Sequence, residues 1–400
     1  MNFFKKAYCR VYQWCFKMVL PMLPYTEPEV KESVLDVKNI LREERINNVL
    51  IVTDKSIREL KLMRDMERDL REFSATNLFY FDDVVPNPTI DNIEAGKAYY
   101  EENSCEAIIA FGGGSVMDCA KMIGARVSNP NKTVSDMKGL LKVKKKTPVI
   151  IAIPTTAGTG SETTLTAVIT DSATHEKYTI NDFHLIPKYA VLDENLTLKL
   201  PPHLTATTGM DALTHAVEAF IGNSTTQYTR RCALDAIRLI VENLPKVYAE
   251  PSNERARKYM LKASYLAGVA FSRSYVGYVH AIAHSLGGKY GTPHGLANAV
   301  VMPYVLSEYG PKINKKLKTM AVFAGIARPY DEEQIAASKF INKILEFNEN
   351  FGIPKKFDFI KTEDITMLAE TADREANPLY PVPVLMNAKE LERIYYNLQA

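Results

Sequence analysis

The chain has 400 residues, enough for two domains of ordinary size, and its hydrophobic content of 46% is typical of globular proteins. Lys and Arg total 49 against 47 for Asp and Glu, and this formal charge of +2 lacks the basic excess of a nucleic-acid-binding surface. Five scattered cysteines without CxxC spacing disfavour a disulfide framework and a thiolate zinc site, so we expect a reduced, cytoplasmic protein.

The first 30 residues form an aromatic segment with early basic residues. Lys17 splits its apolar stretch and Pro21 interrupts it, so a secretory signal is not expected, and no apolar run reaches the roughly 20 residues of a transmembrane helix. Five residues recur at helical spacing: Phe4, Tyr8, Val11, Cys15 and Met18. This stripe fits either a membrane-surface helix or an arm packed on protein. We favour the packed arm, with a second subunit as one partner to consider, because helical stripes are usually buried.

Short β-branched runs alternate with helix-compatible segments between residues 48 and 193. The runs cover 48–54, 78–84, 106–114 and 148–156, followed by extended segments at 166–171, 176–182 and 190–193. This alternation is typical of a parallel sheet flanked by helices. It predicts an α/β domain over residues 1–199, with residues 1–30 as a possible packing arm.

Two loops rich in small residues follow predicted strands. FGGGSVMD at 111–118 leads into a helix expected to begin near Val116, and its glycines would let backbone N–H groups approach a phosphate. It matches neither GxGxxG nor GxxxxGK[ST], so alone it could equally be an ordinary turn. PTTAGTGSE at 154–162 follows the next long strand. Because ligands of open α/β sheets bind at these strand ends, the two loops together favour a phosphate-containing ligand.

Asp54 ends the first predicted strand and has two candidate roles. Its carboxylate could accept hydrogen bonds from an adenosine ribose and repel a 2′-phosphate. It could instead cap the following helix, DKSIREL. The residues alone favour neither role.

The second half of the chain reads as helix. The Leu200-Pro201-Pro202 break marks the domain boundary, and beyond it apolar residues recur at three- and four-residue intervals in 229–244, 253–271 and 332–354. We therefore predict an almost entirely helical domain over residues 200–400.

Four of the seven histidines fall within residues 215–294 of this half. Asp211 and His215 are four residues apart, which places both on one helix face, and His280 and His284 repeat that spacing. His294 follows in a turn. A single pair with this spacing is more often structural than metal-binding. Two pairs together with a loop histidine favour a site for one divalent metal ion. Spacing alone leaves open whether His280 or His284 binds that ion. Asp with imidazoles suits Fe²⁺ or Zn²⁺, with an open position for Lewis-acid chemistry.

Motifs along nearly the whole chain resemble those of the iron-containing, or group III, alcohol dehydrogenase family. They are VTDKS (52–56), PNPT (86–89), GGGSVMDCAK (112–121), PTTAGTGSE (154–162), LPPHLTATTGMDALTHAVEAF (200–220), YVHAIAHSLGGKYGTPHGLANAVVMP (278–303) and ANP (376–378). The resemblance implies a fold shared with dehydroquinate synthase. Its parts are a Rossmann-like nucleotide-binding domain and an all-α metal-binding domain, and a homodimer or larger homo-oligomer is expected.

The resemblance also implies site residues. The implied metal ligands, for iron with zinc as an alternative, are Asp211, His215, His280 and His294, with His284 unligated beside them. The implied NAD contacts are Gly113, Gly114 and Ser115 at the pyrophosphate, Asp118, Thr155, Thr156 and Thr159 nearby, and also Asn87 and Lys177. Asp54 falls where the family selects NAD over NADP.

Two segments depart from the family pattern. Residues 377–383 read NPLYPVP where the family often has NPR-x-PT, so an arginine is missing. Residues 1–30 contain no glycine, although members commonly begin with a strand hairpin that turns at one. We expect the first departure to affect the substrate pocket or the surface, and the second to affect subunit packing.

The expected reaction is hydride transfer between a small alcohol or aldehyde and C4 of the nicotinamide of NAD. The metal would activate the alcohol oxygen, and His284 would pass the hydroxyl proton toward solvent, since imidazoles titrate near neutral pH. A non-redox, NAD- and metal-dependent lyase of the dehydroquinate-synthase type is disfavoured because small apolar residues surround the ligands. A non-catalytic metal-binding protein is disfavoured by the two retained loops. Candidates for the substrate pocket are Phe271, Tyr275, Tyr278 and Met386.

Overall fold

The structure is a computed structural model that describes residues 1, 3–19, 24–72, 76–173 and 177–400. The chain forms two compact units, one of Pro24–Lys199 and one of Met1–Leu23 with Leu200–Ala400. The division after Lys199 lies just before helix α7 (Pro202–Ile221). Pro202 occupies the first turn of this helix, where a missing N–H costs no hydrogen bond.

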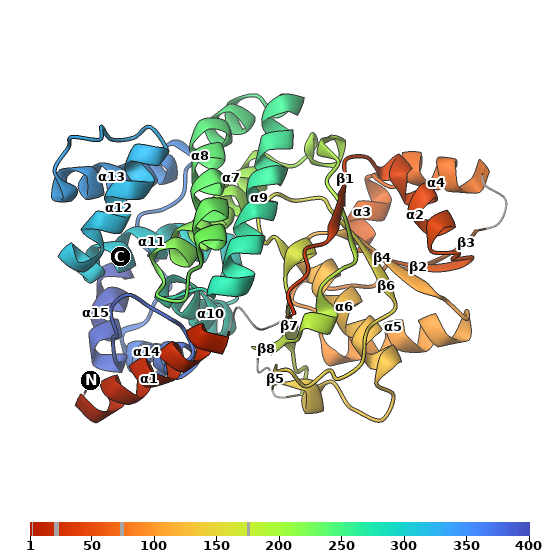
Figure 1. Cartoon of the computed structure of the whole chain (residues 1–400), viewed down its shortest axis with the longest axis horizontal. Coiled ribbons are helices and arrows are strands. Elements are labelled where there is room, and N and C mark those ends of the chain that lie inside the picture. The colour runs from red at the N-terminus through yellow and green to blue at the C-terminus, as the bar shows by residue number, and fades with distance from the viewer. Residues whose placement is uncertain (2, 20–23, 73–75, 174–176) are drawn as a thin grey trace. The chain divides into compact units, whose positions relative to one another are not determined.

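The α/β unit is built on a six-stranded, wholly parallel sheet (Figure 1). In spatial order its strands are β1 (Glu29–Lys31), β9 (Tyr189–Val191), β6 (Val149–Pro154), β4 (Ala107–Gly112), β2 (Asn48–Val52) and β3 (Asn77–Phe81). The flanking helices are α2 (Val37–Glu43), α3 (Lys55–Glu59), α4 (Arg64–Glu72), α5 (Ile90–Glu102) and α6 (Gly114–Ser128). The strands predicted at 48–54, 78–84, 106–114 and 148–156 all lie in this sheet.

Both faces of the sheet are covered because successive strand residues point to opposite sides. In β2, Leu50 and Val52 belong to a core with residues of α5 and α6. Val49 and Ile51 belong to a second core with residues of α2 and α4. This doubly covered arrangement explains why the strands read as continuous apolar runs rather than as alternating ones.

A smaller three-stranded sheet completes the α/β unit. It consists of β5 (Gly139–Leu140), β8 (Lys177–Asn181) and β7 (Thr166–Thr170), in that order. The last two pair antiparallel, with Thr166 opposite Asn181 and Thr170 opposite Lys177. This hairpin corresponds to the extended segments predicted at 166–171 and 176–182.

The second unit is helical, as its apolar periodicity predicts. After α7 it contains α8 (Gln227–Ala249), α9 (Glu254–Ser274), α10 (Tyr278–Tyr290), α11 (His294–Tyr309), α12 (Asn314–Phe323), α13 (Glu333–Asn350), α14 (Ile365–Ala376) and α15 (Ala388–Leu398). Thr226 and Asn387 form capping boxes at α8 and α15, which define where these helices begin. Helices α7, α8 and α9 pack on one another, and α10 lies between α11 and α14. Across the described residues, no helix is both long and apolar enough to cross a membrane.

The N-terminal helix α1 (Phe3–Val19) differs from expectation in two ways. It belongs to the helical unit rather than to a domain of residues 1–199. It packs on its own chain, but through Cys9 and Gln13, whereas the predicted stripe from Phe4 to Met18 is exposed. Polar contacts explain this orientation of α1. Gln13 donates hydrogen bonds to the carbonyl oxygens of Pro378 and Tyr380, and these bonds determine which side of the helix faces the protein.

Candidate active site

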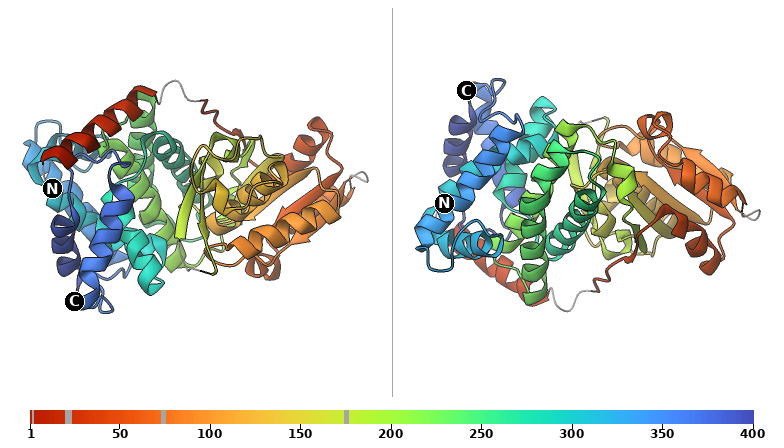
Figure 2. Two further views of the ribbon diagram at one scale, coloured as in Figure 1. Left: turned by 90° about the horizontal axis from the view of Figure 1, so that it is seen from below. Right: turned by 90° about the horizontal axis from the view of Figure 1, so that it is seen from above.

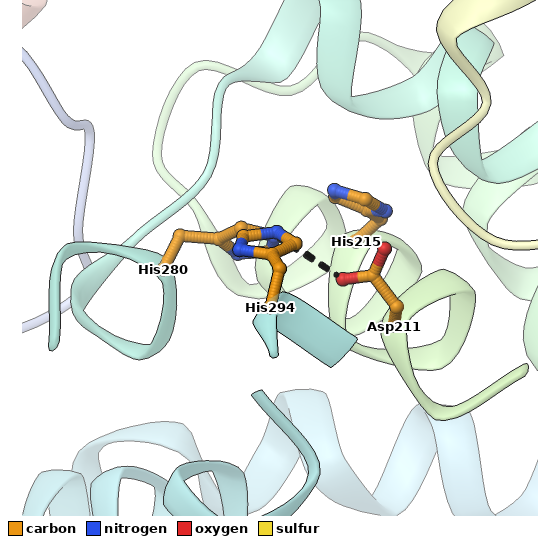
Figure 3. Close-up of side chains that lie close together, drawn as sticks. All are labelled: Asp211, His215, His280 and His294. Atoms are coloured by element: carbon orange, nitrogen blue, oxygen red, sulfur yellow. Dashed lines mark ion pairs between the residues drawn. The ribbon is translucent and has the colours of Figure 1, made fainter. Parts of the chain in front are cut away.

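Three helices bring together the four predicted metal ligands. Asp211 and His215 lie one turn apart on α7, His280 lies on α10, and His294 is the first residue of α11. One ligand atom from each of the four lies within 4.8 Å of the others (Figure 3). Nε2 of His294 is 3.4 Å from Oδ1 of Asp211, and Nε2 of His280 is 3.9 Å from the same oxygen.

The arrangement fits a single divalent ion. Ligand bonds of about 2.1 Å separate the donor atoms around one ion by about 3 to 4.2 Å, close to the spacing observed. Nε2 of His280 is buried and has no hydrogen-bond partner among the described residues. Burial lowers the pKa of His280 well below its ordinary value, with a further contribution from the neighbouring imidazoles, so the ring is neutral. A buried neutral imidazole with an unpaired nitrogen beside a buried carboxylate is suited to metal coordination.

Close backbone contact positions His294. The next residue, Gly295, lies so near α7 that a Cβ there would come within 2.4 Å of the Thr207 carbonyl oxygen. Only glycine permits this approach. The start of α11 can therefore reach the turn of α7 that carries Asp211. On the next turn, the buried Asn298 donates a hydrogen bond of 2.7 Å to Oδ1 of Asp211 and orients that carboxylate.

Glu218, which sequence reasoning missed, orients His280. Its Oε2 lies 2.6 Å from Nδ1 of His280, and the carboxylate also accepts hydrogen bonds from the backbone N–H groups of Gly277 and Val279. Burial raises the pKa of Glu218 to about 7, although these backbone bonds oppose the shift. A cation among the neighbouring ligands would favour the ionised form. The sequence position of Glu218 could have indicated this role. Glu218 is seven residues after Asp211 and three after His215, so all three lie on the same face of α7.

His284 lies beside the cluster and has partners of its own. Its ring stacks on His294 with centroids 5.1 Å apart, and its Nδ1 is 2.6 Å from Oε1 of Glu375. The hydroxyl of Tyr380 donates to the same carboxylate oxygen at 2.7 Å. Spacing left His280 and His284 as alternatives for the third ligand, and the structure places His280 in the cluster. Glu375 and Tyr380 were not predicted, since nothing in their spacing relates them to His284.

The four candidate pocket residues lie in different surroundings. Phe271 stacks on His215 with ring centroids 4.1 Å apart, so an apolar ring borders the cluster. Tyr278 is buried, and its hydroxyl donates to the Met386 carbonyl oxygen, which makes both residues part of the core. Tyr275 contacts Phe16 of α1. Phe271 therefore contacts a residue of the candidate metal cluster directly.

In the α/β unit, the two predicted loops follow adjacent strands. Gly112 pairs with Pro154 at the ends of β4 and β6, and the Thr155 N–H donates to the Gly112 carbonyl oxygen. A Cβ on Gly114 would lie 2.7 Å from the side chain of Thr159, so only glycine lets the start of α6 contact the second loop. Gly113, Ser115, Thr156 and Thr159 remain partly exposed there. The loops thus converge as predicted, with α6 beginning at Gly114 rather than near Val116.

Three more predicted cofactor residues meet at the start of α6. The Asn87 N–H donates to Oγ of Ser115 at 3.2 Å, and Nζ of Lys177 donates to Oδ1 of Asn87 at 2.6 Å. Asn87 adopts a left-handed backbone conformation with φ of 56°, which asparagine tolerates better than most residues. A hydroxyl, an amide and an ammonium group therefore border the N-terminus of a 15-residue helix, where the helix dipole favours an anion.

Asp118 supports this loop from within the protein. One carboxylate oxygen accepts a hydrogen bond from Oγ of Ser161, and the other accepts from the N–H of Val168. Next to it, the buried ammonium of Lys121 donates to Ser161 and to both the hydroxyl and the carbonyl oxygen of Thr164. Both oxygens of Asp118 are thus engaged within the chain, so it holds the 154–162 loop in place.

Asp54 caps a helix. Its Oδ1 accepts a hydrogen bond of 3.0 Å from the Ile57 N–H at the start of α3, which is the helix-cap alternative of the sequence analysis. The cap uses one carboxylate oxygen, and the side chain is partly exposed. The capping bond is therefore compatible with the other proposed role of Asp54, in which its carboxylate accepts hydrogen bonds from the adenosine ribose.

Comparisons with known proteins agree with the fold and the cluster. Residues 30–194 match the family described as iron-containing alcohol dehydrogenase, and residues 205–398 match the C-terminal part of the Fe-containing alcohol dehydrogenase family. The chain is 37% identical over 348 residues to NAD-dependent methanol dehydrogenase of Bacillus methanolicus, covering 85% of this chain and 89% of that protein. It is 38% identical over 351 residues to 1,3-propanediol dehydrogenase of Citrobacter freundii, covering 86% and 90%.

A solved structure shows the same architecture. The crystal structure of a 1,3-propanediol oxidoreductase superposes with a TM-score of 0.89 at 35% identity, covering 94% of this chain and 99% of that one. These relatives are dehydrogenases, which favours redox chemistry over the lyase and the non-catalytic alternatives. The chain therefore belongs to the iron-containing alcohol dehydrogenase family and is an oxidoreductase that acts on CH–OH groups.

Proposed function

We propose that this enzyme interconverts a small primary alcohol and its aldehyde, with NAD as the hydride carrier and Fe²⁺ as the metal. The observation that carries the proposal is the convergence of Asp211, His215, His280 and His294 within 4.8 Å of one another. The named relatives support it, since one is an NAD-dependent methanol dehydrogenase and another acts on 1,3-propanediol.

The ligand chemistry supports iron, with zinc as the alternative. One carboxylate and three imidazoles are ligands that both ions accept, and no cysteine is among them. The family description names iron. Bound there, the ion would supply a Lewis acid that polarises the substrate oxygen. The chain's own contribution is to hold His280 through Glu218 and Asp211 through Asn298, so that these two donors need little reorganisation when the ion binds.

The α/β unit supplies a site suited to NAD. The pyrophosphate would receive N–H groups at Gly113, Gly114 and Ser115, with Thr155, Thr156 and Thr159 in the adjoining loop and with Asn87 and Lys177 at its side. Asp118 would act indirectly, by supporting that loop through Ser161. The exposed part of the Asp54 carboxylate would accept from the adenosine ribose and repel a 2′-phosphate, which favours NAD over NADP.

His284 is proposed to carry the hydroxyl proton. Because Glu375 lies 2.6 Å from Nδ1, that nitrogen holds the ring hydrogen, and Nε2 is available to accept or return a proton. Tyr380 donates to the same oxygen and keeps the carboxylate in place. The role of Glu375 is then to select the tautomer and to stabilise the imidazolium when it forms.

Apolar surroundings support a small, uncharged substrate. Phe271 covers one face of His215, and Ala281, Ala283 and Leu286 lie on the helix that carries His280. Alkyl groups are compatible with such walls, whereas a polyanion would require cationic partners. Formation of a homo-oligomer stays a prediction, and a cytoplasmic location is part of the proposal, supported by five cysteines that form no disulfide.

The proposal is tested by metal analysis coupled to a substrate screen. Anaerobically purified protein should contain about one iron per chain and should oxidise NADH with short aldehydes of varied length and branching. His280→Ala should lose both metal and turnover. His203→Ala, on an exposed residue of the same helix as Asp211, is the matched control and should keep both. Full turnover by metal-free protein, or metal retained by His280→Ala, would contradict the proposed site.

A further inference from the structure

Polar side chains of helix α1 hold the segment 377–383. Gln13, which is only 4% exposed, donates to the carbonyl oxygens of Tyr380 and Pro378 at 2.7 and 3.2 Å. Arg10 donates to Oε1 of Gln13 at 2.8 Å and to two further carbonyl oxygens of the segment at 2.7 and 2.9 Å. Hydrogen bonds depend on direction as well as distance, so these contacts fix where the segment lies. Figures 1 and 2 show α1 at the periphery of the helical unit.

Tyr380 connects this backbone contact to His284. Its carbonyl oxygen accepts from Gln13, while its hydroxyl donates to Oε1 of Glu375 at 2.7 Å. The same carboxylate oxygen lies 2.6 Å from Nδ1 of His284. Burial raises the pKa of Tyr380 well above its ordinary value, and the nearby Glu375 carboxylate adds to the shift, so the hydroxyl keeps its proton and acts as the donor. One tyrosine and one carboxylate therefore join α1 to His284.

The Glu375 carboxylate depends on this support. Its side chain lies on α14 and is 29% exposed, so packing restricts its rotation less than it would restrict that of a fully buried side chain. The Tyr380 hydroxyl and the His284 ring both contact the same oxygen. A shift of the Tyr380 hydroxyl would therefore turn the carboxylate relative to the histidine ring.

A second contact of α1 lies close to the start of α10, the helix that carries His284. The ring of Phe16 packs edge-on against Tyr275 with centroids 5.1 Å apart, and the Tyr275 centroid is 6.3 Å from that of Tyr380. Tyr275 follows α9 directly and has φ of 60° and ψ of 178°, a conformation found almost only at glycine. Such a strained backbone persists only where surrounding contacts hold it. Phe16 supplies one of those contacts.

We propose that α1 positions His284, the proton carrier. Gln13 fixes Tyr380, and Tyr380 in turn orients the Glu375 carboxylate against the histidine ring. This inference rests on the proposed function, in which His284 takes up the hydroxyl proton of the substrate. Gln13 and Tyr380 act through other residues, so they are positioning residues. The family match begins at residue 30, so this support comes from a helix that lies before the matched region.

The polar character of the inward face favours this role over simple packing. Phe4, Tyr8 and Trp14 could cover the helical unit with apolar surface, but all three are exposed, while Gln13 is buried beside Cys9. Burying an amide costs free energy unless its polar atoms are paired, and both the oxygen and the nitrogen of the Gln13 amide are hydrogen-bonded. The contact thus contributes a defined geometry as well as buried area.

Two substitutions interrupt the connection at different points. Gln13→Leu removes the amide donor and roughly keeps the side-chain size, and Tyr380→Phe removes the hydroxyl but keeps the ring. Each should retain its iron and the wild-type KM for NADH, while kcat falls about three- to tenfold, the range expected for one oriented hydrogen bond. Val11→Ala, on the exposed side of α1, is the matched control and should keep wild-type kcat. Gln13→Asn, a shorter amide, provides the same comparison where Gln13→Leu lowers stability.

The double variant and a solvent isotope effect distinguish positioning from a merely structural role. Because both substitutions act on the orientation of Glu375, the kcat of Gln13→Leu/Tyr380→Phe should equal that of Tyr380→Phe alone. The deuterium-oxide isotope effect on kcat should rise in both single variants, since a poorly held histidine slows proton transfer relative to hydride transfer. A purely structural defect would lower the active fraction and the melting temperature while leaving the isotope effect unchanged.

Three outcomes would overturn the inference. The first is wild-type kcat and isotope effect in Gln13→Leu and Tyr380→Phe while His284→Ala is impaired, which would leave the proton carrier itself in place. The second is a double variant in which the two losses multiply, because Gln13 would then act elsewhere. The third is wild-type kcat in His284→Ala, which would refute the proton carrier and this inference together.

Discussion

Oε2 of Glu218 lies 2.6 Å from Nδ1 of His280, a histidine of the candidate metal cluster whose Nε2 is buried without a hydrogen-bond partner among the described residues. A carboxylate that accepts from one nitrogen of a histidine directs the other nitrogen toward the metal and increases its basicity. The relationship connects residues 62 positions apart, through the packing of α7 against the start of α10.

Glu218→Gln should lower iron affinity about 10- to 100-fold. The amide would orient the His280 ring less well, and the substitution removes the negative charge next to that ring. Competition with a chelator measures the affinity, and melting of the metal-free protein reports any separate loss of stability. Glu242→Gln, at an exposed residue of α8, is the control and should change neither. Unaltered iron affinity in Glu218→Gln would limit Glu218 to a structural role.

His284→Ala should keep its iron and lower kcat about 100-fold or more, the range that loss of a general acid or base produces. Glu375→Gln should have a smaller effect, because it perturbs the tautomer without removing the ring. Iron analysis and steady-state kinetics of the two variants provide the measurement. Loss of iron from this variant would instead make His284 a ligand.

Asp54→Asn separates the two roles of that residue. Asparagine caps helices as well as aspartate does, so stability should be unchanged, while removal of the charge should raise kcat/KM with NADPH relative to NADH. Asp54→Ala should relax the preference similarly but also lose about 1 kcal/mol of stability. If Asp54→Asn keeps the wild-type cofactor preference, the residue acts only as a cap.

Gly295→Ala should displace the start of α11, because its Cβ would lie 2.4 Å from a backbone oxygen of α7. We expect weaker iron binding, since His294 moves with that helix, and a loss of stability of about 2 kcal/mol. Gly288→Ala, where a Cβ would meet nothing within 4 Å, is the matched control on α10. Metal titration and thermal melting of the two variants test this, and equal iron affinity would show that α11 tolerates the change.

The buried Glu162 predicts a pH-dependent stability in the α/β unit. Burial raises its pKa from 4.5 to about 7, so between these values the folded state binds more protons than the unfolded state. Stability contributed by the protonated form is therefore present below pH 4.5 and is lost as the pH rises toward 7. Over this window, wild type should lose on the order of 3 kcal/mol of unfolding free energy relative to Glu162→Gln.

Denaturant titrations at several pH values provide the measurement. Glu59→Gln, at an exposed position of the same unit, should behave as wild type. Parallel pH dependence in wild type and Glu162→Gln would mean that the pKa of Glu162 is the same in the folded and unfolded states.

The two departures from the family pattern meet in the structure. The segment 377–383 supplies the carbonyl oxygens of Pro378, Tyr380, Val382 and Pro383, which accept from Arg10 and Gln13 of α1. The missing arginine and the unusual N-terminus thus belong to one contact. Considered separately, the missing arginine predicted an effect on the substrate pocket or the surface, and the unusual N-terminus predicted an effect on subunit packing. Their proximity is not visible along the chain.

Local patterns in the sequence were sufficient for the parts that depend on neighbouring residues. These parts depend on backbone conformation or on a single helix face, which are short-range properties. They are the strand runs, the break before Pro202, the glycine loops and the i,i+4 pairs. These patterns located both units apart from α1, and they located three members of the cluster while leaving His280 and His284 as alternatives for the fourth. They also showed the apolar stripe of α1, although its exposure was the reverse of the expectation for a packed arm.

Only the tertiary structure decided relationships between distant segments. It joined Glu218 to His280 and Glu375 to His284, and it turned α1 so that Gln13 is buried while Phe4 is exposed. The choice of His280 over His284 came first from the family resemblance, and the structure places His280 beside Asp211. Each outcome depends on which polar groups meet where helices that are far apart in the sequence pack against one another. Buried polar groups must find partners, and that requirement can be evaluated only once the helices are packed.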